Sequence, residues 1–400
     1  MSATAEPGSA EAEWRRAGDT GDEGVNAAAE SEAAEAVHNR ERAVAHVPVR
    51  ADLADITPYG APQLDVAVRL NTNETPYPPP PEFFARLADR LTQLPLQRYP
   101  DRRAWALRTA LGERFGLAAD RIWAAKGSNE ILLQLFQAYG GPGRRLLLTD
   151  PGYSAHPFIA RSASTDVVEV GLEPEDFTLD AEAAADAVRR FDPDIICVAS
   201  PHNPAGTLVG PDVVRVLHDT SRALIVVDEA YVELAPRDAS AVALLDELER
   251  LVVCRTFSKA WRLAGLRLGY LLAHSWVIDD LRKVRLPYHL DAVTQAAGLV
   301  ALEIAEQMTA HIQQIIAERE WLIDQLGAVP GLHVYPSAGN FVLVRSGDDQ
   351  LFGRLLERGV LVRDFSRVPG LVGCVRITVG TRAEHDALLD ALRQVLITRN

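Results

Sequence analysis

The sequence predicts an α/β protein with a large domain, built on a mainly parallel sheet flanked by helices, and a smaller C-terminal α/β domain. Stretches with apolar residues at helical spacing alternate with short runs of Ile, Val and Leu. Several of these runs lack polar alternation, as expected for strands buried on both faces of a parallel sheet. The length of 400 residues, of which 48% are hydrophobic, also exceeds what one hydrophobic core usually holds.

The first 46 residues differ in composition from the rest of the chain. They are rich in Ala, Glu, Ser and Gly, carry a net charge of −6, and include Trp14 as their only aromatic residue. Burial of so few apolar side chains does not offset a chain entropy of roughly 1–2 kcal/mol per ordered residue. We therefore expect residues 1–46 to form a disordered acidic tail.

Residues 47–81 are expected to form an extended arm, because Pro76 and the run Pro78–Pro81 disfavour helix. Helical spacing begins after this arm, where we predict that a large domain spans residues 82–305.

Three amphipathic helices are predicted early in the large domain. Two cover Glu82–Leu94 and Ala104–Phe115, and Ser128 is expected to be the N-cap of the third, whose apolar stripe begins at Ile131.

Six apolar runs are predicted to be strands of the large domain. They are Arg145–Leu148, Asp166–Val170, Ile195–Val198, Leu224–Val227, Leu251–Cys254 and Leu268–Leu272.

The C-terminal part of the chain predicts a small domain over residues 306–400. Asp291–Gln325 has the pattern of one long helix, or of two nearly collinear ones, that leads into it. Phe341–Val344 and Val375–Val379 are predicted strands, and Glu384–Leu396 is a predicted helix.

Charge and cysteine content exclude several classes of function. The formal net charge of −14 repels nucleic-acid phosphates and anionic lipid, so we expect neither partner. Cys197, Cys254 and Cys374 have no metal-ligand spacing, which predicts neither a disulfide framework nor a metal site. No apolar run approaches the roughly 20 residues of a membrane span, and no signal-peptide pattern is present. These features favour a cytoplasmic location.

Reactive side chains follow four of the predicted strands. Ligands of open parallel sheets bind at the carboxyl ends of the strands, so residues there are candidates for a site. The four segments are Asp150–Tyr153, Ser200–Thr207, Asp228–Tyr231 and Thr256–Lys259.

This combination of groups fits pyridoxal 5′-phosphate (PLP). The cofactor needs an amine for covalent attachment, an anion beside its ring nitrogen, donors to its phenolate oxygen, a flat group against its ring and a cationic phosphate cup. In that order we assign Lys259, Asp228, Asn203 with Tyr231, Tyr153, and Ser258 with Arg267. Ser128 and Asn129 add donors at a helix N-terminus, which favours anions.

Each of these features alone has an ordinary structural explanation. A Ser-Lys pair is commonly a solvated surface lysine, Asp228 fits a helix cap, and Asn203-Pro204 fits a turn. Their joint appearance, each at a strand end, favours the cofactor site.

At these residues the chain resembles the fold type I PLP-dependent aminotransferases, and within them the histidinol-phosphate aminotransferase family. The similarity runs from about Tyr59 to Val395, and the stretch from Lys259 to Arg267 is typical of the superfamily. Arg285–Leu290 and the arm favour the histidinol-phosphate group. Further similar segments are Leu70–Glu74, Arg98–Asp101, Gly127–Glu130, Val362–Asp364 and Arg376–Gly380.

The resemblance implies transfer of the amino group of L-histidinol phosphate to 2-oxoglutarate, which gives imidazole acetol phosphate and glutamate in histidine biosynthesis. It implies that Lys259, Asp228 and Tyr231 are catalytic. It also implies a homodimer, because Tyr99 is expected to reach the cofactor phosphate of a neighbouring subunit.

The resemblance implies substrate contacts as well. Arg376 is expected to bind the carboxylate of glutamate, and Arg363 with Tyr59 and Tyr288 the histidinol-phosphate side; Asn73, in the similar arm segment, is also expected to bind substrate. Two guanidinium groups suit a pocket that alternates between a phosphate and a carboxylate, since Arg binds both in a bidentate manner.

The chain departs from the family pattern in several places. Thr75 stands where Asn is usual, Pro78 where Gly is usual and His202 where a second Asn is common. Trp261-Arg262 replaces a Phe that is followed by a small residue.

Three alternative functions remain open from the sequence. The pocket suits a phenylalanine or other aromatic aminotransferase, because Tyr59 and Tyr288 would also accept a ring. A PLP-dependent decarboxylase of a phosphorylated amino acid, such as threonine phosphate, would use the same scaffold. A cofactor-sensing domain fused to a partner-binding segment is disfavoured, because residues 1–46 are acidic and show no helix-turn-helix pattern.

Overall fold

A computed structural model describes residues 47–54, 56 and 60–397. The chain divides into two compact units, residues 1–54 and 55–400. The predicted acidic tail at residues 1–46 lies outside the described residues, and the described part of the first unit, residues 47–54, includes a 3₁₀ turn at Ala51–Leu53. The second unit contains the helices and strands from β1 onward.

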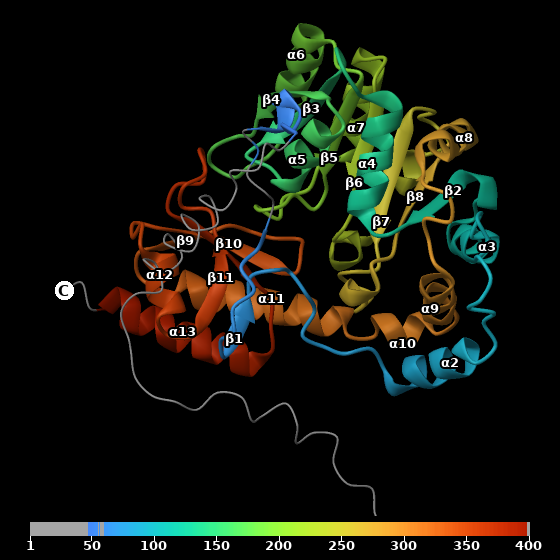
Figure 1. Cartoon of the computed structure of the whole chain (residues 1–400). Helices are drawn as coiled ribbons and strands as arrows, with labels where there is room; N and C mark the ends of the chain where they lie inside the picture. Colours follow the sequence, from blue (N-terminus) through green and yellow to red (C-terminus); the bar gives the residue numbers. More distant parts are fainter. Residues whose placement is uncertain (1–46, 55, 57–59, 398–400) are drawn as a thin grey trace, which may run out of the picture. The chain divides into compact units, whose positions relative to one another are not determined.

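A seven-stranded sheet forms the larger part of this unit (Figure 1). Its strands run in the order β2-β8-β7-β6-β5-β3-β4, parallel from β7 to β4, whereas β8 is antiparallel to both of its neighbours. The bounds are β2 Ile122–Ala125, β3 Arg145–Asp150, β4 Asp166–Gly171, β5 Ile195–Ala199, β6 Leu224–Asp228, β7 Leu251–Thr256 and β8 Gly269–Ala273. All six predicted strands are present.

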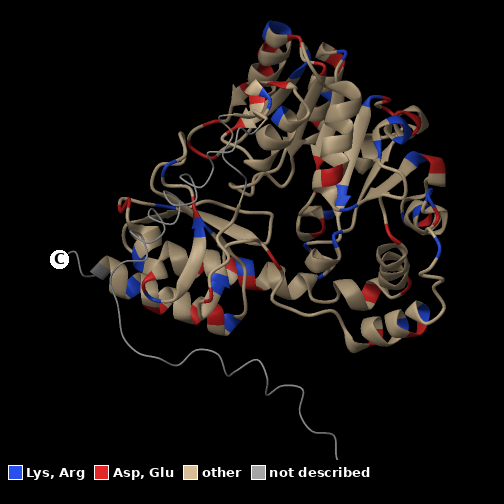
Figure 2. Ribbon diagram, in the orientation of Figure 1, with Lys and Arg blue, Asp and Glu red and all other residues tan. Residues whose placement is uncertain are grey.

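Helices cover both faces of this sheet, as the continuous apolar runs predict. Every residue of β5, β6 and β7 is buried. One face packs against α4 (Ser128–Tyr139), α5 (Ala155–Ser162) and α8 (Ser275–Val284). The other face packs against α3 (Trp105–Phe115), α6 (Ala181–Phe191), α7 (Pro211–Thr220) and α9 (Ala292–Glu303). Acidic and basic residues lie mostly on the helices and loops (Figure 2).

A second, five-stranded sheet has the order β1-β11-β12-β10-β9. Its strands are β1 Val68–Leu70, β9 Leu332–Val334, β10 Phe341–Ser346, β11 Val360–Asp364 and β12 Cys374–Thr378. Its core includes α11 (Ile312–Gly327), α12 (Leu351–Leu356) and α13 (Arg382–Ile397). Because β1 pairs in parallel with β11, the arm contributes a strand to this sheet. The predicted domain boundaries at residues 82 and 306 stay predictions.

Two sequence-based predictions about helices were wrong in detail. The predicted helix at residues 82–94 is α2 (Pro81–Leu91) and ends three residues early. Residues 291–325, predicted to form one long helix or two nearly collinear ones, form parts of three helices, α9, α10 (Ala305–Thr309) and α11. The first break falls at Ile304, whose φ of −115° and ψ of 34° are not helical.

The predicted N-cap of α4 was also wrong by one residue. Gly127 is the N-cap, with a φ of 87°, and Ser128 is the first helical residue. The positive φ at position 127 favours glycine, and a Cβ there would also lie 2.7 Å from Nη2 of Arg267.

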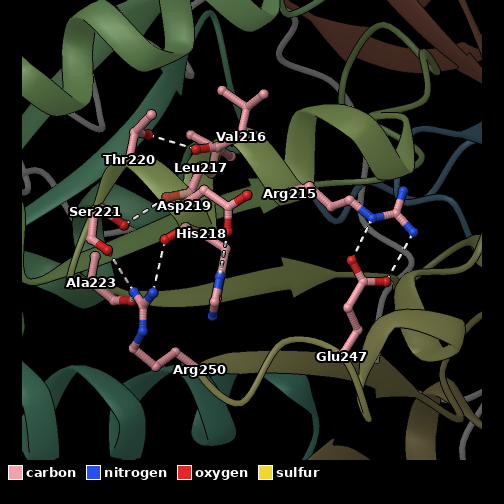
Figure 3. Close-up of polar contacts among 10 residues, drawn as sticks. All are labelled: Arg215, Val216, Leu217, His218, Asp219, Thr220, Ser221, Ala223, Glu247 and Arg250. Carbon is pink, nitrogen blue, oxygen red and sulfur yellow. Dashed lines mark hydrogen bonds and ion pairs between the residues drawn. The ribbon is translucent and has the colours of Figure 1, made fainter.

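The edge of the seven-stranded sheet at the amino ends of its parallel strands is fixed by Arg250 (Figure 3). Its guanidinium donates to the carbonyl oxygens of His218, Ser221 and Ala223 at 2.8, 2.8 and 3.1 Å. These bonds satisfy carbonyl groups at the end of α7 and join the α7–β6 turn to the start of β7. Among the described residues, no helix has the length and apolar character that crossing a bilayer requires.

Candidate active site

The four segments chosen from the sequence do converge at one edge of the seven-stranded sheet. They follow β3, β5, β6 and β7, which all run in the same direction. A pocket at this edge brings together eleven of the predicted site residues: Asn73, Ser128, Asn129, Tyr153, Asn203, Asp228, Tyr231, Ser258, Lys259, Arg267 and Arg376.

Lys259 lies half-buried in this pocket. Its Nζ donates to the backbone oxygen of Thr72 at 2.8 Å and lies 5.7 Å from the ring centroid of Tyr231. Burial, and after it the nearby guanidinium of Arg376, lower the pKa of Lys259 to about 7. Part of the amine is therefore neutral near pH 7, and the neutral amine is the nucleophilic form.

Asp228 ends β6 and is 5% exposed. Its Oδ2 lies 3.2 Å from Nε2 of the buried His156, and its Oδ1 accepts the backbone N–H of Ala230 at 3.2 Å. The ring of His156 also meets Tyr153 edge to face at 5.1 Å. These contacts orient a carboxylate toward the pocket beside Tyr153.

A cup of donors occupies the part of the pocket near α4. Arg267 Nη1 donates to Ser258 Oγ at 3.2 Å, and the Thr256 hydroxyl donates to Ser258 Oγ at 2.9 Å. The first turn of α4, at Ser128 and Asn129, lines the same region, where a helix N-terminus favours anions.

Backbone packing beside this cup requires glycine at position 269. A Cβ at Gly269 would lie 2.5 Å from the backbone nitrogen of Ser128. The cup's guanidinium, hydroxyl groups and helix N-terminus suit a phosphate, while the amine and the carboxylate lie in the same pocket. The residues present therefore fit the cofactor expected from the sequence.

Asn203 is linked to the second sheet through Arg376, and Tyr231 is linked to the arm through Asn73. Arg376 Nη1 donates to Oδ1 of Asn203 at 2.5 Å, and its Nη2 donates to the backbone oxygen of Asn71 at 2.8 Å. Asn73 Nδ2 donates to the Tyr231 hydroxyl at 3.0 Å. Arg376 thus extends from β12 of the five-stranded sheet into the pocket at the edge of the seven-stranded sheet.

Arg363 lies next to this pocket rather than in it. It lines a smaller cavity together with Tyr153, Asn203 and Arg376. Arg363 and Arg376 are direct cross-strand partners on β11 and β12, so both project from the same face of the sheet. Two like charges held opposite each other suit an anionic ligand.

Two predicted site residues, Tyr99 and Tyr288, lie away from the pocket. Tyr99 is 79% exposed, and its ring stacks on that of Tyr288, with centroids 4.3 Å apart and planes at 13°. Neither residue lines the pocket of its own chain. Tyr59 lies outside the described residues. The roles predicted for all three stay predictions.

Three contacts at the site were missed from the sequence. Thr72 contributes a backbone oxygen, which no side-chain pattern reveals. Thr256 stands in a segment that was singled out, two residues before Ser258. His156 follows Tyr153 by three residues, a helical spacing that would place both on one face. Among the described residues, no group of three or more His, Cys, Asp or Glu side chains is arranged to hold a metal ion.

Comparison with known proteins identifies the family. Residues 65–392 match the model of the family "Aminotransferase class I and II". A histidinol-phosphate aminotransferase of Streptomyces avermitilis is 44% identical over 368 residues, which cover 88% of this chain and 98% of the relative. A histidinol-phosphate aminotransferase of Mycolicibacterium smegmatis is 45% identical over 362 residues, or 87% of this chain and 93% of the relative.

A solved structure agrees with these relatives. The histidinol-phosphate aminotransferase of Sinorhizobium meliloti, in complex with pyridoxal-5′-phosphate, superimposes with a TM-score of 0.80 at 26% identity, covering 89% of this chain and 99% of that one. The fold is therefore that of the fold type I enzymes expected from the sequence. The chain belongs to the class I and II aminotransferases and, within them, to the histidinol-phosphate aminotransferase family.

Proposed function

We propose that this chain is a PLP-dependent aminotransferase that moves the amino group of L-histidinol phosphate to 2-oxoglutarate. The products are imidazole acetol phosphate and glutamate, as in histidine biosynthesis. The observation that carries the proposal is one pocket that holds Lys259, Asp228, Arg267 and Arg376, in a chain that is 44% identical to an enzyme of this name.

PLP bound at Lys259 would supply an electron sink for the charge that develops at the donor's α-carbon. Asp228, held by His156, would keep the ring nitrogen protonated. Ser258 and Arg267 would bind the phosphate, and Asn203 and Tyr231 would donate to the phenolate oxygen.

Lys259 would act twice in the reaction. Its amine would hold the cofactor, and when free its Nζ would take the proton from the donor's α-carbon as a general base. A pKa of about 7 suits this work, because a base with a pKa near the working pH is both available and strong enough.

Arg376 and Arg363 would bind the two substrates in turn. The donor carries a phosphate and the acceptor carries carboxylates, and two fixed guanidinium groups on neighbouring strands accommodate both anions. Since each substrate reacts in a separate half-reaction, we expect ping-pong kinetics.

A panel of amino donors tests the proposed function. The purified full-length chain with PLP is assayed with 2-oxoglutarate and L-histidinol phosphate, L-phenylalanine or O-phosphothreonine, with glutamate and carbon dioxide as readouts. We expect the highest kcat/KM with histidinol phosphate. An equal or higher value with phenylalanine would assign an aromatic aminotransferase, and carbon dioxide release without a keto acid would assign a decarboxylase.

Substitution of the attachment residue is the matching control. Lys259→Ala is expected to abolish the absorbance of bound cofactor and the turnover, whereas Lys283→Ala, at an exposed lysine paired with Asp280, should retain both. Full turnover in Lys259→Ala would contradict the assignment.

We further propose that the protein is a cytoplasmic homodimer. Buried free thiols at Cys197, Cys254 and Cys374 fit a reducing compartment. Support for the dimer comes from an exposed apolar surface around Tyr99, described below, and the other partners are the small-molecule substrates.

A further inference from the structure

Arg262 has a backbone conformation that few side chains adopt. It stands three residues after Lys259, with a φ of 61°, in the left-handed region that disfavours every residue with a Cβ. Its backbone N–H bonds to the Lys259 carbonyl oxygen at 3.2 Å. A strained residue persists where the surrounding contacts hold it in place.

The guanidinium of Arg262 makes those contacts. Its Nε donates to Nδ1 of His311 at 2.5 Å, and its Nη1 donates to the carbonyl oxygen of Pro78 at 3.0 Å. His311 is 5% exposed and precedes α11, and the ring of Tyr77 meets it edge to face at 5.8 Å. Arg262 therefore joins the Lys259 loop, the arm and the start of α11.

The arm that Arg262 holds also forms part of the pocket. The Thr72 carbonyl accepts from Lys259 Nζ, and Asn73 donates to the Tyr231 hydroxyl. The segment of residues 72–78 is thus bound to the catalytic lysine at one end and to Arg262 at the other. Because Arg262 lies in the same loop as Lys259, its two contacts fix the position of the arm relative to the reactive amine.

We propose that Arg262 is a positioning residue that holds residues 72–78 over the amino-donor pocket. It acts through the arm and the Lys259 loop, without touching the substrate. The inference rests on the proposed function, since Thr72 and Asn73 of this segment line the pocket assigned to the amino donor.

Arg262→Gly separates this role from a purely structural one. Glycine removes the guanidinium and also relieves the left-handed strain, so the fold should keep its melting temperature to within about 3 °C. In the holoenzyme we expect backbone amides of residues 73–77 to exchange hydrogen about tenfold faster, because two anchoring bonds are lost. KM for the amino donor should rise about tenfold, while kcat falls less than threefold.

Asp192→Gly is the matched control. Asp192 is exposed and also has a positive φ, of 41°, but it is the C-cap of α6 and does not line the pocket. This variant should change neither arm exchange nor KM. Arg262→Lys, which keeps a cation able to reach one of the two acceptors, should fall between wild type and Arg262→Gly in both readouts.

Two results would overturn the inference: arm exchange in folded Arg262→Gly equal to that of wild type, or faster exchange with an unchanged KM. If Arg262→Gly does not fold, hydrogen exchange of the arm and KM for the amino donor in Arg262→Lys test the inference instead. A wild-type protein without aminotransfer to any donor would instead overturn the proposed function, and the exchange measurement would still test whether Arg262 holds the arm.

Discussion

At the residue scale, the chemistry of the site depends on the charge state of Lys259. Burial and Arg376 lower its pKa to about 7, whereas an ordinary lysine titrates near 10.4. Arg376 is in turn fixed by Asn203 and by the backbone of Asn71. The same guanidinium assigned to substrate carboxylate therefore also activates the amine.

Trace acylation of the apoenzyme measures this pKa directly. Reactivity follows the neutral fraction, so labelling of Lys259 should rise about tenfold between pH 6 and 8 and then level off. Lys283, whose pKa is raised by a hydrogen bond to Asp280, should keep gaining reactivity beyond pH 10. Peptide mass spectrometry distinguishes the two, and a continued rise at Lys259 above pH 9 would contradict a lowered pKa.

Residues were predictable from the sequence when a side chain followed a strand. Lys259, Asp228 and Asn203 each come just after a continuous apolar run, and parallel strands bring such positions to one edge. The Thr72 carbonyl and His156 were not predictable in this way. One is a backbone group, and the other lies on a helix whose orientation depends on tertiary packing.

At the scale of elements, a buried ion pair ties β6 to β7. Glu229, directly after β6, is 0% exposed and contacts Arg255 of β7 at 2.8 Å. It also accepts from Ser240 Oγ and the backbone N–H of Ala241, the latter at 2.6 Å. The pair fixes the spacing between the strand ends that carry Asp228 and Lys259.

Removal of one partner of this buried ion pair should lower the unfolding free energy much more than removal of one partner of an exposed pair. Glu229→Ala leaves Arg255 buried without its nearest carboxylate, so we expect a loss of about 3–5 kcal/mol of unfolding free energy. Glu247→Ala removes the exposed pair with Arg215 drawn in Figure 3, and should leave the melting temperature nearly unchanged. Urea unfolding measures the free energy of both variants, and an equal loss in Glu229→Ala and Glu247→Ala would contradict a structural role for the buried pair.

The elements themselves were predicted unevenly. The parallel strands β5, β6 and β7 were clear because buried strands are continuously apolar. The antiparallel direction of β8 and the pairing of β1 with β11 were not predicted. Direction and long-range pairing depend on contacts between distant parts of the chain, and local periodicity carries no information about them.

At the scale of the whole molecule, two segments joined by one aromatic contact expose several large apolar side chains. Leu96, Tyr99, Trp105 and Leu286 are 65%, 79%, 47% and 73% exposed, and the Tyr99–Tyr288 stack joins the two segments that carry them. Exposed apolar patches of this kind mark interaction sites. A second copy of the chain is the occupant expected from the role predicted for Tyr99.

A dimer held by this surface should be sensitive to charge. We expect light scattering to give a dimer for the wild type and a monomer for the double variant Leu96→Asp, Leu286→Asp, because two buried carboxylates would lose their hydration on association. Val372→Asp, at an equally exposed residue of another loop, should remain dimeric. A monomeric wild type would refute the proposed assembly.

The pairing of β1 with β11 couples movement of the five-stranded sheet to the position of the arm. Leu70 is hydrogen-bonded into that sheet, opposite Val362, and only two residues later Thr72 holds the reactive amine. Two residues reach at most about 7 Å when fully stretched, so the chain between Leu70 and Thr72 allows little relative movement of its two ends. If the five-stranded sheet moved away from the seven-stranded one, the Thr72 oxygen would move with it. The hydrogen bond between Thr72 and Lys259 would then break as the pocket opened.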